Sequence, residues 1–311
     1  MLGSTSVRHW RYDSLSLFVR VFCTHRPLTA TVGGVVSDAN FLSDPSGTAM
    51  AHWVRSNCIN AANGSVMRTS PVGVIGLNST EEETFEHAIC MGAITHSDPR
   101  CAISVAVVSG LIRGICAGEV QTEADVDALL ERAWAHVADA FSEHPFERQE
   151  FDKHAFATSL DALVLSDRQM GYVYKCLGSA LWCLRQVLRG QHDFRSAMVE
   201  LVMCGGDADT NGAVAGALMG AHCGYEGLPS EWRDGLRHRD WYMEKIEALF
   251  VVVGLKQGTY DAESDPDTTL DGGKGFLSDE EMDKRVQVIM EKIRAAGNQR
   301  PVLKKTWWKF W

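Results

Sequence analysis

The 311-residue sequence has no long apolar run. Its longest nearly apolar stretch, residues 101–112, contains two serines and is well short of the ~20 residues that cross a bilayer. The N-terminus also lacks the apolar core of a secretory signal, because Arg20 interrupts the run from Leu15 to Phe22. We therefore expect a cytoplasmic, intracellular protein without a membrane span.

Paired cysteines and an excess of basic residues are absent too. The nine cysteines are odd in number and form no Cys-x-x-Cys pair, so we expect buried, reduced thiols. Thirty Lys and Arg face forty Asp and Glu, which leaves a net charge of -10. Such a surface repels phosphate backbones and argues against nucleic acid as a general partner. The surplus acid serves solubility alone, or part of it is gathered to hold cations.

Strand-like alternation is scarce, whereas helical periodicity is frequent. The sequence therefore predicts an all-α fold with a single compact multi-helix domain. The predicted helices span residues 46–57, 81–95, 100–117, 122–141, 170–188, 194–203, 210–222, 240–250 and 282–296. The helix at 122–141 begins with the pattern Thr122-x-x-Asp125, which is typical of a capping box.

The chain divides by composition into three parts. Residues 1–256 form the predicted helical domain, and residues 257–277, polar and rich in Gly and Asp, form a flexible linker. Residues 278–311 comprise a C-terminal helix and a basic, aromatic tail. Two interpretations of the tail stay open: it docks on its own domain or is partly ordered, or it contacts an anionic membrane or a partner.

The most informative segment reads Gly-Gly-Asp-Ala-Asp-Thr at residues 205–210. Carboxylates at positions i and i+2 cannot share one helical face. Asp207 and Asp209 can therefore both point inward only if Asp207 lies in a loop and Asp209 in the first turn of a helix. The preceding glycines permit such a loop. With the Thr210 hydroxyl they form an oxygen-rich group suited to Mg²⁺, Mn²⁺ or Ca²⁺. The alternative is that Asp209 or Thr210 merely caps a helix while Asp207 is solvated.

A second segment, residues 60–71, contains an Asn-Gly-Ser turn followed by Met-Arg and then Pro71. Proline disfavours the helical conformation of the residue before it, and Asn-Gly-Ser is typical of an irregular turn. We therefore expect Asn63 and Arg68 to project from a constrained loop.

Two further segments contain a histidine or tyrosine side chain whose role is either functional or structural. Thr95-His96 precedes Asp98-Pro99 at the predicted junction of two helices, where His96 is either a surface or helix-terminal histidine or a catalytic one. Tyr172 follows a glycine, and its ring either faces a flat ligand or packs in the core.

Taken in this order, the segments resemble the ADP-ribosylglycohydrolase family of helical, metal-dependent enzymes. Residues 63–68 look like its Asn-Gly-small-x-Met-Arg loop, and residues 95–99 are similar to its Thr-His helix junction. Residues 205–210 are similar to the signature that supplies two aspartates and a threonine to a binuclear Mg²⁺ or Mn²⁺ centre. The resemblance covers about residues 10–250.

The resemblance implies a metal-dependent hydrolase that cleaves the glycosidic bond between ADP-ribose and an acceptor. The implied partner is ADP-ribose or an ADP-ribosylated protein, and we expect a monomer. One or two Mg²⁺ or Mn²⁺ ions are implied at Asp13, Asp207, Asp209 and Thr210, with the three aspartates as catalytic residues. The implied substrate-binding residues are Asn63, Gly64, Ser65, Met67, His96, Gly171 and Tyr172.

The N-terminal part departs from the family pattern. The Gly-Asp-Ala-Leu-Gly opening is missing, and where Thr-Asp-Asp-Thr is expected Asp13 keeps one carboxylate while Arg11 and Tyr12 replace Thr and Asp. An inward Arg11 would oppose a metal, since like charges about 4 Å apart cost on the order of 4 kcal/mol at an effective dielectric of 20. The alternative to an active hydrolase is therefore a catalytically impaired ADP-ribose-binding protein. The missing opening is either real or reflects a truncated sequence.

Overall fold

The computed structural model describes residues 30–142, 144, 146–268 and a few later positions, namely 280, 281, 284, 287, 288 and 291. Residues 28–260 form one compact unit, and the later described residues belong to a second unit. Asp13 and the C-terminal tail lie outside the described residues, as does most of the predicted helix at 282–296.

The fold of the described chain is helical, which confirms the all-α prediction. Its twelve α-helices are joined by loops and short 3-10 helices, with one isolated β-bridge between Ala62 and Tyr172. The helices are α2 (Ala30–Val36), α3 (Pro45–Arg55), α4 (Val66–Ile75), α5 (Glu81–Ala93), α6 (Pro99–Cys116), α7 (Glu123–Ala140), α8 (Arg148–Ala155), α9 (Val173–Leu188), α10 (Phe194–Met203), α11 (Ala208–Cys223), α12 (Ser230–Asp234) and α13 (Arg239–Val252).

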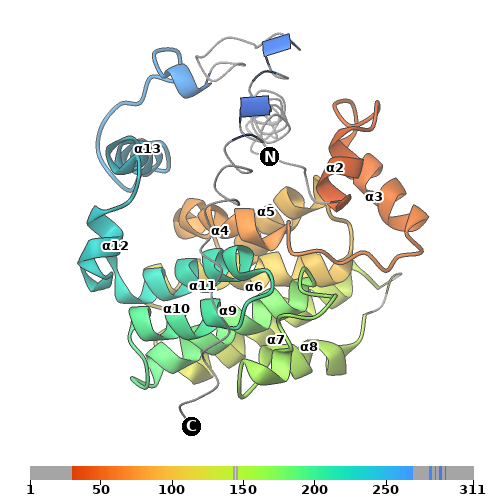
Figure 1. Ribbon diagram of the computed structural model, residues 1–311, viewed down its shortest axis with the longest axis horizontal. Helices are drawn as coiled ribbons and strands as arrows, with labels where there is room; N and C mark the ends of the chain where they lie inside the picture. The colour runs from red at the N-terminus through yellow and green to blue at the C-terminus, as the bar shows by residue number, and fades with distance from the viewer. Residues whose placement is uncertain are drawn as a thin grey trace, which may run out of the picture. The chain divides into compact units, whose positions relative to one another are not determined.

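Helix α6 is the centre of the unit 28–260. It contacts α4, α5, α7, α9 and α11, and Figure 1 shows it within the stack of helices. Among the described residues α6 is the one helix long and apolar enough, by length and composition, to cross a membrane, yet 78% of that window is buried by the rest of the domain. Each fully buried Val, Leu or Ile contributes about 1.5–3 kcal/mol, so α6 organises the core.

Helix α7 begins as its sequence predicts. The Thr122 hydroxyl accepts a hydrogen bond from the backbone N–H of Asp125 at 3.3 Å, and the Asp125 carboxylate accepts one from the N–H of Thr122 at 2.8 Å. These reciprocal bonds satisfy two N–H groups that have no partner within the helix. The predicted helix at 122–141 is thus confirmed as Glu123–Ala140.

The expectation of an irregular loop through residue 71 is wrong. Helix α4 runs through Pro71, which lacks the N–H that would bond the carbonyl of Met67. The helix forms nevertheless, because its buried face packs against α6: the Gly73 backbone lies so close to the carbonyl of Ser109 that a Cβ atom would be 2.5 Å from that oxygen. Arg68 consequently lies on a helix and not on a loop.

The cysteines only partly follow the expectation of burial. Cys101, Cys176 and Cys183 are buried, and burial raises the pKa of the Cys101 thiol to about 12. Cys90 and Cys116 are exposed, because each lies on the outer side of the last turns of a helix. All the cysteines in the described chain are free thiols.

Two helical glycines test how tightly α4 and α6 pack. In Gly73→Ala the new methyl group would lie 2.5 Å from the Ser109 carbonyl oxygen and 2.7 Å from Cβ of Ile112, so we expect the free energy of unfolding to fall by about 1–3 kcal/mol. Gly220→Ala in α11 is the matched control, because a Cβ atom there meets nothing within 4 Å. We expect it to stabilise the protein by about 0.5–1 kcal/mol. Urea unfolding measures both, and equal effects would contradict the close packing.

Candidate active site

The turn before α11 depends on two glycines. Gly205 and Gly206 have φ values of +72° and +68°, the left-handed region that glycine adopts without strain. A Cβ atom on Gly206 would also lie 2.0 Å from the carbonyl oxygen of Leu165. The chain therefore turns sharply against the backbone at Leu165, and Asp207 takes the position directly before α11.

Asp207 occupies the N-cap position of α11, but in the described structure its side chain makes no capping hydrogen bond. Instead, Oδ2 of Asp207 accepts a hydrogen bond from Nδ2 of Asn63 at 2.6 Å. Neither Asp209 nor Thr210 is at the cap position, since both lie inside the first turn of α11. The simple capping interpretation is therefore wrong, and the Asp207 carboxylate is held by a residue 144 positions earlier in the chain.

Asn63 is itself fixed by the segment before α9. Its backbone N–H donates to the carbonyl of Gly171 at 2.9 Å, and the N–H of Val173 donates to the carbonyl of Ala61 at 3.0 Å. A Cβ atom on Gly171 would lie 3.9 Å from Oδ1 of Asn63 and 4.0 Å from Oδ2 of Asp207. Three segments far apart in sequence thus meet at one carboxylate.

The first turn of α11 adds two more of the predicted residues. The buried Thr210 hydroxyl lies 3.8 Å from the sulfur of Met67, to which it donates a weak hydrogen bond. Asp209 is exposed on the same turn. Asp207, Asp209 and Thr210 therefore lie on one short stretch of chain, which faces the Asn-Gly turn through Asn63 and Met67.

These oxygens are donors of the chemical type that a hard divalent cation prefers. Mg²⁺ is usually held by one or two carboxylates and keeps several waters, so Asp207, Asp209 and the Thr210 hydroxyl are suitable donors. No group of three or more His, Cys, Asp or Glu side chains comes together within the residues that the structure describes. Asp13, the remaining predicted ligand, lies outside them.

His96 lies beside the Asn-Gly turn and is 4% exposed, so the interpretation of it as a surface histidine is wrong. Its Nδ1 is 2.8 Å from the Thr95 hydroxyl oxygen, which also accepts a hydrogen bond from Arg68 at 2.8 Å. Burial, followed by the positive charge of Arg68, lowers the pKa of His96 to about 3. The imidazole is therefore neutral at physiological pH.

Arg68 holds the turn and the end of α5 together. Its guanidinium donates to the carbonyls of Gly64, Met91 and Gly92 as well as to the Thr95 hydroxyl. Gly64 and Ser65 are both buried. The backbone of the predicted substrate loop is thus rigidly attached to the His96 segment.

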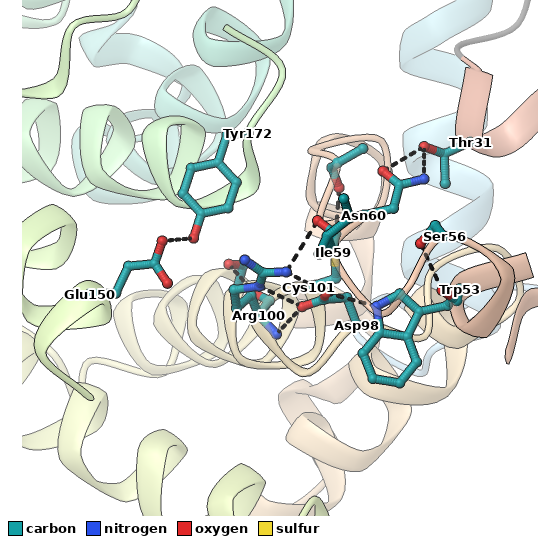
Figure 2. Close-up of polar contacts among 12 residues, drawn as sticks. Thr31, Trp53, Ser56, Ile59, Asn60, Asp98, Arg100, Cys101, Glu150 and Tyr172 are labelled. Carbon is teal, nitrogen blue, oxygen red and sulfur yellow. Dashed lines mark hydrogen bonds and ion pairs between the residues drawn. The ribbon is translucent and has the colours of Figure 1, made fainter. Parts of the chain in front are cut away.

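A second polar group, which the sequence did not reveal, supports the segment leading to Asn63. The buried carboxylate of Asp98 accepts hydrogen bonds from the indole N–H of Trp53 at 2.8 Å and from Nε of Arg100 at 2.8 Å (Figure 2). Arg100 also donates to the carbonyl of Ile59 at 3.3 Å. The Asp-Pro pair signals a helix start, but no sequence pattern links it to a tryptophan 45 residues earlier.

The Tyr172 side chain is held by Glu150 and lies near Arg100 of this second polar group. Its hydroxyl donates to Oε1 of Glu150 at 2.7 Å (Figure 2), and the guanidinium carbon of Arg100 lies 5.7 Å from the ring centre. The ring also packs edge-on against Tyr174 and His154. The ring thus packs among protein side chains, while the backbone of the preceding residue, Gly171, lies close to Asp207.

The neutral, buried His96 predicts a pH-dependent stability. Because its pKa is lowered in the folded protein, the unfolded chain binds the extra proton between about pH 6.5 and 3, so stability falls as pH decreases through this range. We expect His96 to account for a loss of about 2 kcal/mol in the free energy of unfolding between pH 7.5 and 5. Unfolding of His96→Gln should show a correspondingly smaller pH dependence. His87→Gln on the exposed side of α5 is the control, and equal slopes for wild type and His96→Gln would refute the assignment.

The chain is similar to known proteins over much of its length. A 26% identical relative is an uncharacterized protein of Archaeoglobus fulgidus, matched over 64% of this chain and 61% of its own length. The ADP-ribosyl-[dinitrogen reductase] glycohydrolase of Rhodospirillum rubrum is 40% identical over 20% of this chain and 22% of its own. An ADP-ribosylarginine hydrolase of Serratia proteamaculans is 24% identical over 62% of this chain and 47% of its own.

The chain thus spans at most about three-fifths of the length of these relatives. A family model described as ADP-ribosylglycohydrolase matches residues 6–259, which include every segment of the site described above. The convergence of the Asn-Gly turn, the Thr-His junction and the Gly-Gly-Asp turn agrees with this match. The chain belongs to the ADP-ribosylglycohydrolase family.

Proposed function

We propose that this chain is a hydrolase that cleaves the glycosidic bond between ADP-ribose and an acceptor, either a protein side chain or a small conjugate. The observation that carries the proposal is the placement of Asp207. Its carboxylate is not used to cap α11, and Asn63 orients it toward the meeting point of three segments. Membership of the family supports the reaction class.

The proposed reaction is a displacement by water at the anomeric carbon of the ribose. The bond from this carbon to the acceptor nitrogen or oxygen breaks, water supplies a hydroxyl to the carbon, and a proton passes to the leaving group. Asp207 and Asp209 place negative charge where the ribosyl carbon becomes positive. Either carboxylate can take the proton of the attacking water, and Asn63 keeps Asp207 in one orientation for that step.

We propose Mg²⁺ or Mn²⁺ as the cofactor, held by Asp207, Asp209 and Thr210. When bound, such an ion supplies Lewis acidity and orients oxygen groups. The buried donors around the Asn-Gly turn would hold the substrate: Asn63, Gly64, Ser65 and His96 come from the same part of the fold. Hydroxyl and phosphate oxygens of ADP-ribose suit such donors.

Binding of ADP-ribose without turnover is the second candidate. The observation that favours it is the replacement of two expected metal-site residues by Arg11 and Tyr12. Such a protein would keep the Asn-Gly turn and the Thr-His junction, whose residues are intact, but would hold the cation too weakly to hydrolyse the bond.

The carboxylates provide a direct test of the proposed activity. We expect Asp207→Asn and Asp209→Asn to lower the release of ADP-ribose from ADP-ribosyl-arginine by at least about 100-fold, because each removes a charge and a potential proton acceptor. Asp139→Asn, an exposed residue of α7, is the matched control and should keep full activity. Chelation with EDTA should abolish release, and added Mg²⁺ or Mn²⁺ should restore it.

Two results would change the proposal. Release that continues unchanged in both variants would reject these aspartates as the active site. Tight binding of ADP-ribose by calorimetry, with no release from ADP-ribosyl-arginine or from O-linked conjugates at any metal concentration, would establish the binding protein in place of the hydrolase.

A further inference from the structure

The His96 side chain carries an unpaired polar atom in a nearly closed position. Nε2 of His96 is buried and has no hydrogen-bond partner among the described residues, although the side chain is only 4% exposed. His96 lines a cavity of about 260 Å³, whose wall is formed by residues of α2 and α3, by Asn60 and by the turn 95–97. An unpaired donor or acceptor in such a place is costly unless a ligand or water satisfies it.

The hydrogen bonds of Thr95 determine which atom of the His96 ring carries the proton. The Thr95 hydroxyl oxygen accepts a hydrogen bond from Nη2 of Arg68, and an arginine can only donate. Because Thr95 is buried, its hydroxyl hydrogen also needs an acceptor, and the other described partner of this oxygen is Nδ1 of His96 at 2.8 Å. If Nδ1 accepts this hydrogen, the proton of the neutral imidazole lies on Nε2.

We propose that Arg68 and Thr95 are positioning residues that fix His96 as a neutral Nε2–H donor, which donates to an oxygen of the bound ADP-ribose moiety. The order of donation runs from the Arg68 guanidinium to the Thr95 hydroxyl and from there to Nδ1 of His96. The ligand part of this inference rests on the proposed function, whereas the position of the proton does not.

Packing fixes the ring as firmly as the hydrogen bonds do. A Cβ atom on Gly64 would lie 3.2 Å from both Cε1 and Nε2 of His96, so this edge of the ring rests against the glycine backbone. The neighbouring residue Asn63 holds Asp207. Two consecutive residues of one turn therefore set the positions of a neutral donor and of a carboxylate.

The charge of the ring follows from its surroundings. Arg68 is the charged group that acts on His96 from α4, and together with burial it keeps the imidazole neutral. A neutral Nε2–H donor pairs with a hydroxyl or phosphate oxygen through a hydrogen bond and adds no net charge to the cavity. The opposite tautomer would present a lone pair there, which repels a phosphate oxygen and can only accept a hydrogen from a hydroxyl group.

The position of the proton is tested first, in protein without ligand. In ¹⁵N-labelled protein at pH 7 we expect a pyridine-like nitrogen shift for Nδ1 of His96 and a pyrrole-like shift for Nε2. Thr95→Val removes the hydroxyl at nearly constant shape and should move both shifts toward averaged values, while Thr95→Ser should restore the original pattern. A pyrrole-like Nδ1 in the wild type, or shifts unchanged in Thr95→Val, would overturn the assignment.

The role toward the ligand is tested by calorimetry with ADP-ribose. We expect Thr95→Val to weaken binding about tenfold and Thr95→Ser to retain wild-type affinity. His96→Gln, whose side-chain amide keeps a donor near the Nε2 position, should bind ADP-ribose more tightly than His96→Asn. Unfolding curves for each variant separate a loss of fold from a loss of the donor.

The outcomes distinguish this inference from the proposed hydrolase. A protein that binds ADP-ribose but hydrolyses nothing, with the expected shifts and affinities, would support the inference and reject the hydrolase. Equal affinity in wild type and Thr95→Val, with the proton moved in the variant, would overturn the role toward the ligand. Absence of ADP-ribose binding by the wild type would overturn it as well.

Discussion

The hydrogen bond from Asn63 to Asp207 joins two distant segments of the helical unit at the point where chemistry is expected. It connects the turn before α4 with the start of α11, two elements 144 residues apart. Its 2.6 Å length requires both backbones to be placed accurately, and each is: Asn63 by the carbonyl of Gly171, and Asp207 by the left-handed glycines before it. Asn63, Gly171 and Asp207 are thereby held together at one point of the fold.

Helix α6 and the polar group at its N-terminus support the segment that leads to Asn63. Asp98 caps α6 while accepting hydrogen bonds from Trp53 and Arg100, so the helix is anchored at the end nearest to the Asn-Gly turn. The Cys101 thiol, one turn further on, donates to the carbonyl of Ala62. A buried charge pair with all its oxygens satisfied resists displacement, since separating it would leave an uncompensated charge.

Whether a feature of the fold or of the site could be predicted from the sequence depends on how far apart in the chain the interacting residues lie. Residues that act within a few positions were predicted: the capping box of α7, and the glycine turn that presents Asp207. Partners distant in sequence were not, because neither the burial of His96 nor the bond from Trp53 to Asp98 leaves a periodic signal. The prediction of a loop around Pro71 was wrong for a related reason: tertiary packing on α6 outweighs a local helix breaker.

The positions of the site residues along the chain determine when the site can form during synthesis. The residues that meet at Asp207 come from before α4, from before α9 and from the start of α11, so the last of them leaves the ribosome after nine of the twelve described helices have been made. Domains generally fold as units during synthesis. Because α6 packs against α9 and α11 as well as against α4, α5 and α7, the nascent chain completes both its core and the Asn63–Asp207 contact only when α11 emerges.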